Sequence, residues 1–297
     1  MTPTPARTVL ERLADPRPIL LDGALGTEIA RRGFETRLPL WSAHALAHAP
    51  RVVAEIHAEH VHAGAEILTA NTFRTHRRSL ERGGLGSRAR RLTAEAVALA
   101  RQAAAPAGAF VAGSIAPLED CYRPDLVPDD AALVSEHGEM AGHLADAGAD
   151  LLLVETMNTI REAWVATAAA RATGLPVMTS LVCDESEALL SGETVAAAVR
   201  ALAPLRPAAL LVNCVPANAI ERPLRALVAA KPQGIRAGAY GNIGHADDVH
   251  GWAADADVPP GAYARLALAW IAAGASIVGG CCGTTPEHVA AIRRALG

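Results

Sequence analysis

The feature of this sequence that most constrains its fold is a repeat of short apolar runs, each followed by a segment of helical character. The runs are rich in β-branched and aliphatic residues and end in Gly, Asn, Thr or Pro. Their near-continuous apolar character is typical of strands that are buried on both faces of a parallel sheet. The runs cover residues 18–26, 65–73, 109–117, 150–158, 175–183, 208–216, 235–243 and 275–283.

The segments between the runs carry the signals of helices. In residues 51–65, apolar Val52, Ile56 and Val61 recur at roughly helical spacing, and Gly64 follows the pattern as a stop signal. Eight strand–helix repeats in 297 residues predict a single-domain (β/α)₈ barrel over residues 1–297, with residues 1–16 as a peripheral extension. A doubly wound open sheet is the alternative, which is disfavoured because no run is followed by a G-x-G-x-x-G turn.

Composition excludes several classes of function. The formal net charge of −4 provides no basic surface for nucleic acid. No apolar run reaches the roughly 18 residues of a membrane helix, and the first residues lack the pattern of a signal peptide. These observations predict a cytoplasmic protein with no nucleic-acid or membrane partner, and they leave a homo-oligomer open. Five cysteines in a chain of this length favour metal binding or reactive thiols over a disulfide scaffold.

Polar residues gather at the ends of the predicted strands, where the active site of a (β/α)₈ barrel forms. Cys214 ends the sixth run, and the adjacent Cys281 and Cys282 end the eighth, only one strand further around the ring. The other polar residues at strand ends are Asp22, Asn71, Thr72, Glu155, Thr156, Asn213 and Asn242.

The three cysteines at strand ends predict a zinc site. Three converging thiolates prefer zinc over Mg²⁺ or Ca²⁺, and three protein ligands leave the fourth position open, as in catalytic zinc sites. Adjacent cysteines point to opposite faces of a regular strand, so the glycines around Cys281 and Cys282 are needed to bend the backbone. The alternative is that these cysteines are small core residues. Cys121 and Cys183 are predicted not to be ligands.

Several motifs resemble the homocysteine S-methyltransferase family, namely LDGALGTE, LTANTF, LPLWSAHAL, VNCVP and GGCCGTTPEHV. The similarity runs from about residue 17 to residue 294, which is nearly the whole chain. The resemblance implies a (β/α)₈ barrel with Zn²⁺ held by Cys214, Cys281 and Cys282. It also implies that the small-molecule thiol homocysteine binds through its sulfur at the open position.

The same resemblance assigns candidate substrate-binding residues. Asp22 and Glu155 match acidic residues of the family and are candidates to bind the ammonium group of homocysteine, while backbone amides of residues 23–27 are candidates to bind its carboxylate. The alternatives are a turn or helix cap for Asp22 and a buried ion pair for Glu155. The remaining candidates are Asn71, Thr72 and Asn242, which orient substrate or cap loops, and the aromatic residues Phe73 and Trp41 near the mouth.

The predicted reaction moves a methyl group from a cationic sulfonium donor to homocysteine and gives methionine. A betaine donor would favour an aromatic cage, and the chain has only three Phe, three Tyr and four Trp. A donor on cobalamin or folate would normally need additional modules, and a separate corrinoid partner is a further alternative. In a different class, a zinc- or thiol-sensing barrel would use Cys281 and Cys282 as a labile redox pair.

Two groups of basic residues bear on these alternatives. Arg74, His76, Arg77 and Arg78 follow the second run, where a cation would disfavour a cationic donor unless Arg74 binds a donor carboxylate. The second group could be mistaken for a metal cluster, but it is predicted to face solvent on alanine-rich helices; it comprises His44, His48, His57, His60 and His62.

Overall fold

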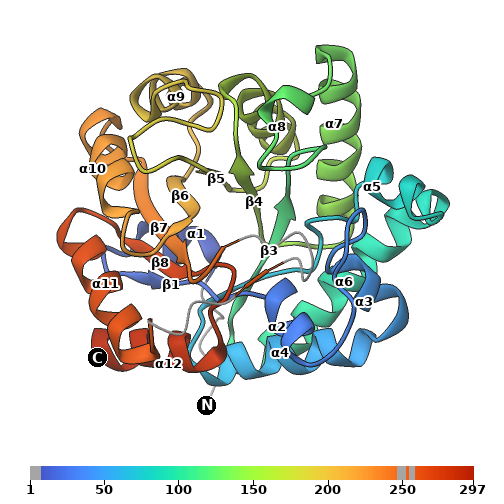
Figure 1. The fold of residues 1–297 in the computed structure, drawn as a ribbon, viewed down its shortest axis with the longest axis horizontal. Coiled ribbons are helices and arrows are strands. Elements are labelled where there is room, and N and C mark those ends of the chain that lie inside the picture. The colour runs from blue at the N-terminus through green and yellow to red at the C-terminus, as the bar shows by residue number, and fades with distance from the viewer. Residues whose placement is uncertain (1–7, 246–251, 254–257) are drawn as a thin grey trace.

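The computed structural model describes residues 8–245, 252–253 and 258–297, and these form a closed barrel of parallel strands (Figure 1). Within the described residues, eight strands pair in the order β1-β8-β7-β6-β5-β4-β3-β2. Between β1 and β2, the backbone N–H of Asp22 donates to Ile67 O at 3.0 Å and closes the ring. The strands are β1 Ile19–Leu20, β2 Ile67–Thr69, β3 Phe110–Ile115, β4 Leu151–Met157, β5 Val177–Leu181, β6 Ala209–Pro216, β7 Arg236–Asn242 and β8 Ile277–Gly280.

The helices surround the barrel and cover the outer face of the sheet (Figure 1). Each predicted run contains one of the strands, so the (β/α)₈ prediction is confirmed and the open-sheet alternative is wrong. None of the described helices is long and apolar enough to cross a bilayer. The helices are α1 Val9–Ala14, α2 Gly26–Arg31, α3 Ala43–His48, α4 Pro50–His62, α5 Arg77–Arg82, α6 Ala89–Ala104, α7 Asp130–Asp146, α8 Ile160–Ala172, α9 Val195–Leu202, α10 Glu221–Ala230, α11 Pro260–Ala272 and α12 Pro286–Leu296.

Strand side chains divide between two apolar layers because successive residues of a strand point to opposite faces. On β4, Leu152 and Val154 join the layer between the sheet and the helices. Leu151 and Leu153 instead pack inside the barrel with residues of the other strands. Glu155 continues this inward row at the carboxyl end of β4, so the alternation itself directs its carboxyl group toward the mouth of the barrel.

Helix α1 lies outside the strand–helix repeat, at the amino-terminal ends of the strands. Arg12 forms an ion pair with Glu66 just before β2, with Nε and Oε2 2.6 Å apart. The guanidinium of Arg236, the first residue of β7, donates to the backbone oxygens of Leu13 and Asp15. Residues 9–15 therefore cover the end of the barrel opposite the mouth.

The prediction that all five histidines face solvent is wrong for two residues of α4. The side chains of His57 and His60 are fully buried, and His60 Nε2 lies 3.3 Å from Ala24 O. Burial lowers the pKa of His57 to about 3 and that of His60 to about 4, so both rings are neutral at pH 7. They are core residues that pack α4 against the barrel. His48 and His62 are exposed, as predicted.

Candidate metal centre and substrate cavity

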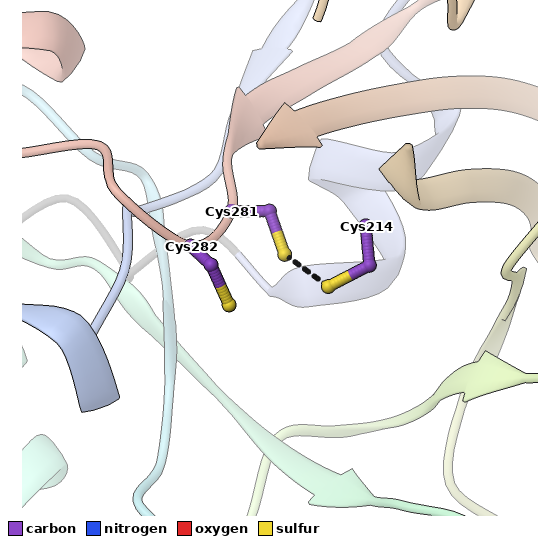
Figure 2. A group of neighbouring side chains, drawn as sticks. All are labelled: Cys214, Cys281 and Cys282. Carbon is purple, nitrogen blue, oxygen red and sulfur yellow. Dashed lines mark hydrogen bonds between the residues drawn. The ribbon is translucent and has the colours of Figure 1, made fainter. Parts of the chain in front are cut away.

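Three cysteine sulfurs meet at the carboxyl ends of β6 and β8, the strands on either side of β7 (Figure 2). The Sγ atoms of Cys214, Cys281 and Cys282 all lie within 4.8 Å of one another. Those of Cys214 and Cys281 are 2.9 Å apart. The predicted convergence of these thiols is present, and the local backbone geometry explains how it is achieved.

The two adjacent cysteines both reach the site because they follow the last residue of β8. The N–H of Cys281 still donates to Gly241 O at 2.9 Å, and the chain then turns through Gly283, whose φ is 82°. A Cβ atom at position 283 would lie 2.0 Å from Ile243 O, so the turn requires glycine. Freed from the strand alternation, the side chains of Cys281 and Cys282 lie on the same side of the turn (Figure 2).

Cys214 is directed into the site by an irregularity of β6. The pairing register shifts between Asn213 and Pro216, and Cys214 has a φ of 53°, which is unfavourable for a residue with a Cβ atom. A matching shift in β4 gives Thr156 a φ of 60°. The Asn213 side chain connects the two: its Oδ1 accepts from Thr156 N at 3.2 Å, and its Nδ2 donates to Thr156 Oγ1 at 2.8 Å. Such strain is characteristic of functional sites.

Mutual hydrogen bonds separate the pKa values of the clustered thiols. Hydrogen bonds from Cys214 and Cys282 hold the pKa of Cys281 well below its ordinary value, while the hydrogen bond to Cys281 raises the pKa of Cys214. A bound divalent cation would remove the remaining protons. Three soft sulfur ligands with no fourth cysteine in the cluster fit a zinc ion with one open position.

The other two cysteines do not join this cluster. Among the described residues, the group of three ligand atoms includes neither Cys121 nor Cys183. Cys183 packs in the apolar layer beneath the helices, next to Leu189. Cys121 is buried at the wall of the adjoining cavity, and burial raises its pKa to about 12.

A cavity of about 670 Å³ opens above the three thiols. Of the residues predicted to bind substrate, five line this cavity with the cysteines; these are Asp22, Trp41, Asn71, Phe73 and Glu155. The lining does not include Thr72 or Asn242. The Oγ1 of Thr72 is fully buried and bonds both the N–H and the carbonyl of Ser114, which joins the loop after β2 to β3. The backbone oxygen of Asn242 accepts from Ala217 N at 3.0 Å.

Glu155 is 8% exposed and is held by two hydroxyl groups. Ser114 Oγ donates to Oε1 at 2.5 Å, and the Tyr240 hydroxyl donates to Oε2 at 3.1 Å. Burial raises the pKa of Glu155 to about 7, with the Ser114 hydrogen bond acting in the opposite direction. No cation among the described residues offsets this burial, so the buried ion pair considered as an alternative is absent there.

Asp22 combines a local role with a place in the cavity. Its Oδ2 accepts from Thr69 N at 2.7 Å and its Oδ1 from Thr69 Oγ1 at 2.9 Å, which fixes the loop after β1 to β2. Burial raises the pKa of Asp22 to about 8, despite the opposing hydrogen bonds from Thr69. Two buried carboxyl groups, Asp22 and Glu155, thus face one cavity, and neither pairs with a cationic side chain among the described residues, which favours a cationic group on the ligand.

Several residues that line the cavity were not predicted from the sequence. Tyr240 lies at an inward-facing position of β7. The alternation of side chains along that strand could have predicted that it points into the barrel. Tyr122 and Trp252 lie in loops, where no periodicity marks them, and both line the cavity.

Comparison with known proteins agrees with this geometry. Residues 19–296 match the family model described as Homocysteine S-methyltransferase. The chain is 34% identical to the homocysteine S-methyltransferase of Escherichia coli (strain K12), over 96% of this chain and 97% of that protein. It is 26% identical to homocysteine S-methyltransferase 3 of Zea mays, over 94% and 90% of the two chains.

Solved structures give the same result. The metallated form of the homocysteine methyltransferase MmuM from Escherichia coli superposes with a TM-score of 0.82 at 29% identity, covering 96% of this chain and 99% of that one. The apo form of MmuM gives a TM-score of 0.74 at 27% identity, over 99% and 100% of the two chains. From the family match over almost its whole length and from its E. coli relative, we conclude that this chain belongs to the homocysteine S-methyltransferase family.

Proposed function

We propose that this homocysteine S-methyltransferase takes its methyl group from a cationic sulfonium donor and delivers it to homocysteine bound at zinc. The observation that carries the proposal is the convergence of three thiols, Cys214, Cys281 and Cys282, beside a cavity with two buried carboxyl groups that pair with no cationic side chain among the described residues. The thiols fit the metal and the carboxyl groups fit the ammonium of the acceptor. The metallated form of MmuM supports metal binding in a relative of this chain.

The protein's own residues would bind and orient the acceptor. Glu155 and Asp22 would hold its ammonium group, and the ring hydroxyl of Tyr240 would keep the Glu155 carboxylate in place. Zinc at the three cysteines would supply a deprotonated acceptor sulfur at neutral pH, since it lowers the pKa of a coordinated thiol. Transfer then forms one S–CH₃ bond and breaks the C–S⁺ bond of the donor, whose sulfur keeps the electron pair and becomes a neutral thioether. The residues mainly position the two reactants.

The walls of the cavity suit a cationic methyl donor. Only Phe73 and Trp41 were predicted near the mouth, but Tyr122, Tyr240 and Trp252 also line the cavity among the described residues. Aromatic faces attract sulfonium and quaternary ammonium groups alike through their quadrupoles. The low aromatic count of the chain is therefore no argument against betaine, and the two kinds of donor have to be compared directly.

The basic residues after β2 are mostly directed away from the cavity. Arg77 forms an ion pair with Glu139, and Arg78 pairs with Glu136 and Glu119. Only Arg74 of this group lines the cavity. Of this group, Arg74 is therefore the residue placed to repel a cationic donor, and Arg37, from another loop, also lines the cavity.

The donor is tested by supplying zinc-loaded protein with ¹³C-labelled homocysteine and one trideuteromethyl donor at a time. The donors are S-methylmethionine, S-adenosylmethionine, betaine and methylcobalamin, and methionine is followed by mass spectrometry. We expect ¹³C-methionine with a CD₃ group from at least one sulfonium donor, about 10-fold faster than from betaine or methylcobalamin, which corresponds to roughly 1.4 kcal/mol of transition-state preference. Equal or faster transfer from betaine would refute the sulfonium donor. Absence of transfer from every donor would favour the thiol-sensing alternative.

The pKa of Glu155, raised to about 7, predicts a pH dependence for acceptor use. Glu155 pairs with an ammonium group only when it is ionised, so the pairing is lost as the pH falls through 7. We expect kcat/KM for homocysteine to fall about 10-fold from pH 8 to pH 6, relative to a thiol of similar length that lacks the amino group. In Glu155→Gln, the ratio of kcat/KM for homocysteine to kcat/KM for the other thiol should not change with pH. The same lack of pH dependence in wild-type protein would contradict this role.

A further inference from the structure

The loop between β3 and α7 brings three consecutive residues to the cavity. Asp120, Cys121 and Tyr122 all line it, although their segment is neither strand nor helix. Cys121 is buried, whereas the Tyr122 side chain is 38% exposed. A loop without regular structure needs contacts with the rest of the protein to hold its side chains in fixed positions. The hydrogen bonds to this loop therefore indicate whether Tyr122 has a fixed position.

The first restraint is the buried guanidinium of Arg74, which is only 5% exposed. Its Nη1 donates to Glu119 O at 2.9 Å and to Pro117 O at 3.4 Å, both in this loop. The guanidinium also lies over the ring of Phe73, with 5.2 Å between Cζ and the ring centroid. Burial lowers the pKa of Arg74, so placing the cation here is costly. The cost is offset by hydrogen bonds that fix the loop backbone.

Two buried residues near the start of α8 restrain the same loop. The Nδ2 of Asn158 donates to Cys121 O at 3.0 Å, the residue just before Tyr122. Oε1 of Glu162 accepts from Leu118 N at 2.8 Å, and it also lies 3.1 Å from His137 Nε2 on α7. Both side chains are fully buried. The loop is therefore bonded on one side by the segment after β2 and on the other by α8.

These restraints hold Tyr122 in the wall of the cavity at the thiol cluster. Tyr122 lines the same cavity as Cys214, Cys281 and Cys282. Tyr122 and Cys214 come from opposite sides of the mouth, one from the loop after β3 and the other from β6. Tyr122 is therefore held at the wall of the cavity into which the three thiols open.

We propose that Tyr122 forms the donor-binding wall of the cavity and that Arg74, Asn158 and Glu162 are positioning residues that hold its loop in place. The assignment of this wall to the methyl donor rests on the proposed function. It gives the buried Arg74 a role other than binding a donor carboxylate, because Nη1 is used on loop carbonyls. The two roles differ in a measurable way, since direct binding requires a carboxylate on the donor and positioning does not.

The test compares Arg74→Lys and Asn158→Ala with Arg77→Lys, a matched control whose guanidinium pairs with Glu139 outside the cavity. A lysine ammonium cannot reproduce the geometry of the guanidinium at the loop carbonyls. We expect each of the first two substitutions to raise the donor KM about 10-fold, as for the loss of a charge-assisted or buried hydrogen bond, with less than about a twofold change in homocysteine KM. Zinc content should stay the same, and Arg77→Lys should resemble wild-type protein.

Two further measurements separate positioning from other roles. In a Tyr122→Ala background, Arg74→Lys should change the donor KM less than about twofold, because Arg74 acts through the loop that carries Tyr122. With trimethylsulfonium, which has no carboxylate, Arg74→Lys should raise the donor KM as much as it does with S-methylmethionine. An undiminished effect in the Tyr122→Ala background, or an effect confined to the carboxylate-bearing donor, would overturn the proposal.

Hydrogen–deuterium exchange gives a readout that does not need turnover. Amides of residues 117–123 should exchange faster in Arg74→Lys and in Asn158→Ala than in wild-type protein or Arg77→Lys. If Arg74→Lys does not fold, Asn158→Ala carries the same test. Faster exchange in the variants, together with no methyl transfer from any donor, would refute the proposed function but support the positioning role. Unchanged exchange in both variants would refute the positioning role whatever the donor.

Discussion

Replacing Cys214 with Ala is expected to release zinc and abolish methyl transfer to homocysteine. The variant keeps only two of the three clustered sulfurs, and the described residues offer no other cysteine, histidine or carboxylate to that group. Two protein ligands do not make the three-ligand site typical of catalytic zinc. Metal analysis should therefore fall from about one zinc per chain in protein purified under reducing conditions to less than about 0.1, and the same loss is expected for Cys281→Ala and Cys282→Ala.

Cys121→Ala and Cys183→Ala are the matched controls, because each removes a thiol of the same chain from outside the cluster. Both should keep about one zinc per chain. If the clustered cysteines were only small core residues, Cys214→Ala would keep its metal and lose little more than packing. Full zinc retention by Cys214→Ala would therefore disprove the site.

Changing Glu155 to Gln is expected to lower kcat/KM for homocysteine about 10- to 150-fold while zinc content is preserved. The substitution removes the charge but keeps a side chain of the same size and an oxygen that can accept from Ser114 or Tyr240. A charge-assisted hydrogen bond to a partly buried ammonium contributes roughly 1.5–3 kcal/mol, which corresponds to this range.

The control for Glu155 is a thiol of similar length that lacks the amino group. It should react equally poorly with wild-type protein and with Glu155→Gln, because it has no ammonium group to lose. If Glu155 serves only the structure of the barrel, the variant should lose thermal stability and both thiols should lose activity to the same extent. Kinetics with both acceptors, together with melting temperature and zinc content, decide between these outcomes.

The strand ends could be predicted from sequence because the barrel imposes a simple rule on them. Runs of apolar residues mark strands buried on both faces, and parallel strands bring their carboxyl ends to one rim. Cys214 and Cys281, 67 positions apart along the chain, could thus be placed together without coordinates. The glycines around the paired cysteines also indicated a bend, and Gly283 makes it.

The backbone irregularities and the cavity walls could not be predicted in the same way. Cys214 and Thr156 both have positive φ, and the Asn213 side chain, beside Cys214, exchanges hydrogen bonds with Thr156 on a strand that is distant in sequence. The buried His57 and His60 share the inward face of α4 with Val53 and Ile56, but the polarity of their rings led to the prediction of solvent exposure. Tyr122 and Trp252 of the cavity wall lie in loops, where residues have no periodic pattern.

The most direct test of the account is X-ray absorption at the zinc edge, recorded on the protein before and after homocysteine is added. The central claim is that the acceptor sulfur joins the three cysteine sulfurs at the open position of the metal. We predict three sulfur neighbours at roughly 2.3 Å without homocysteine and a fourth at a similar distance when it is present. An unchanged number of sulfur neighbours in the presence of saturating homocysteine would contradict the claim.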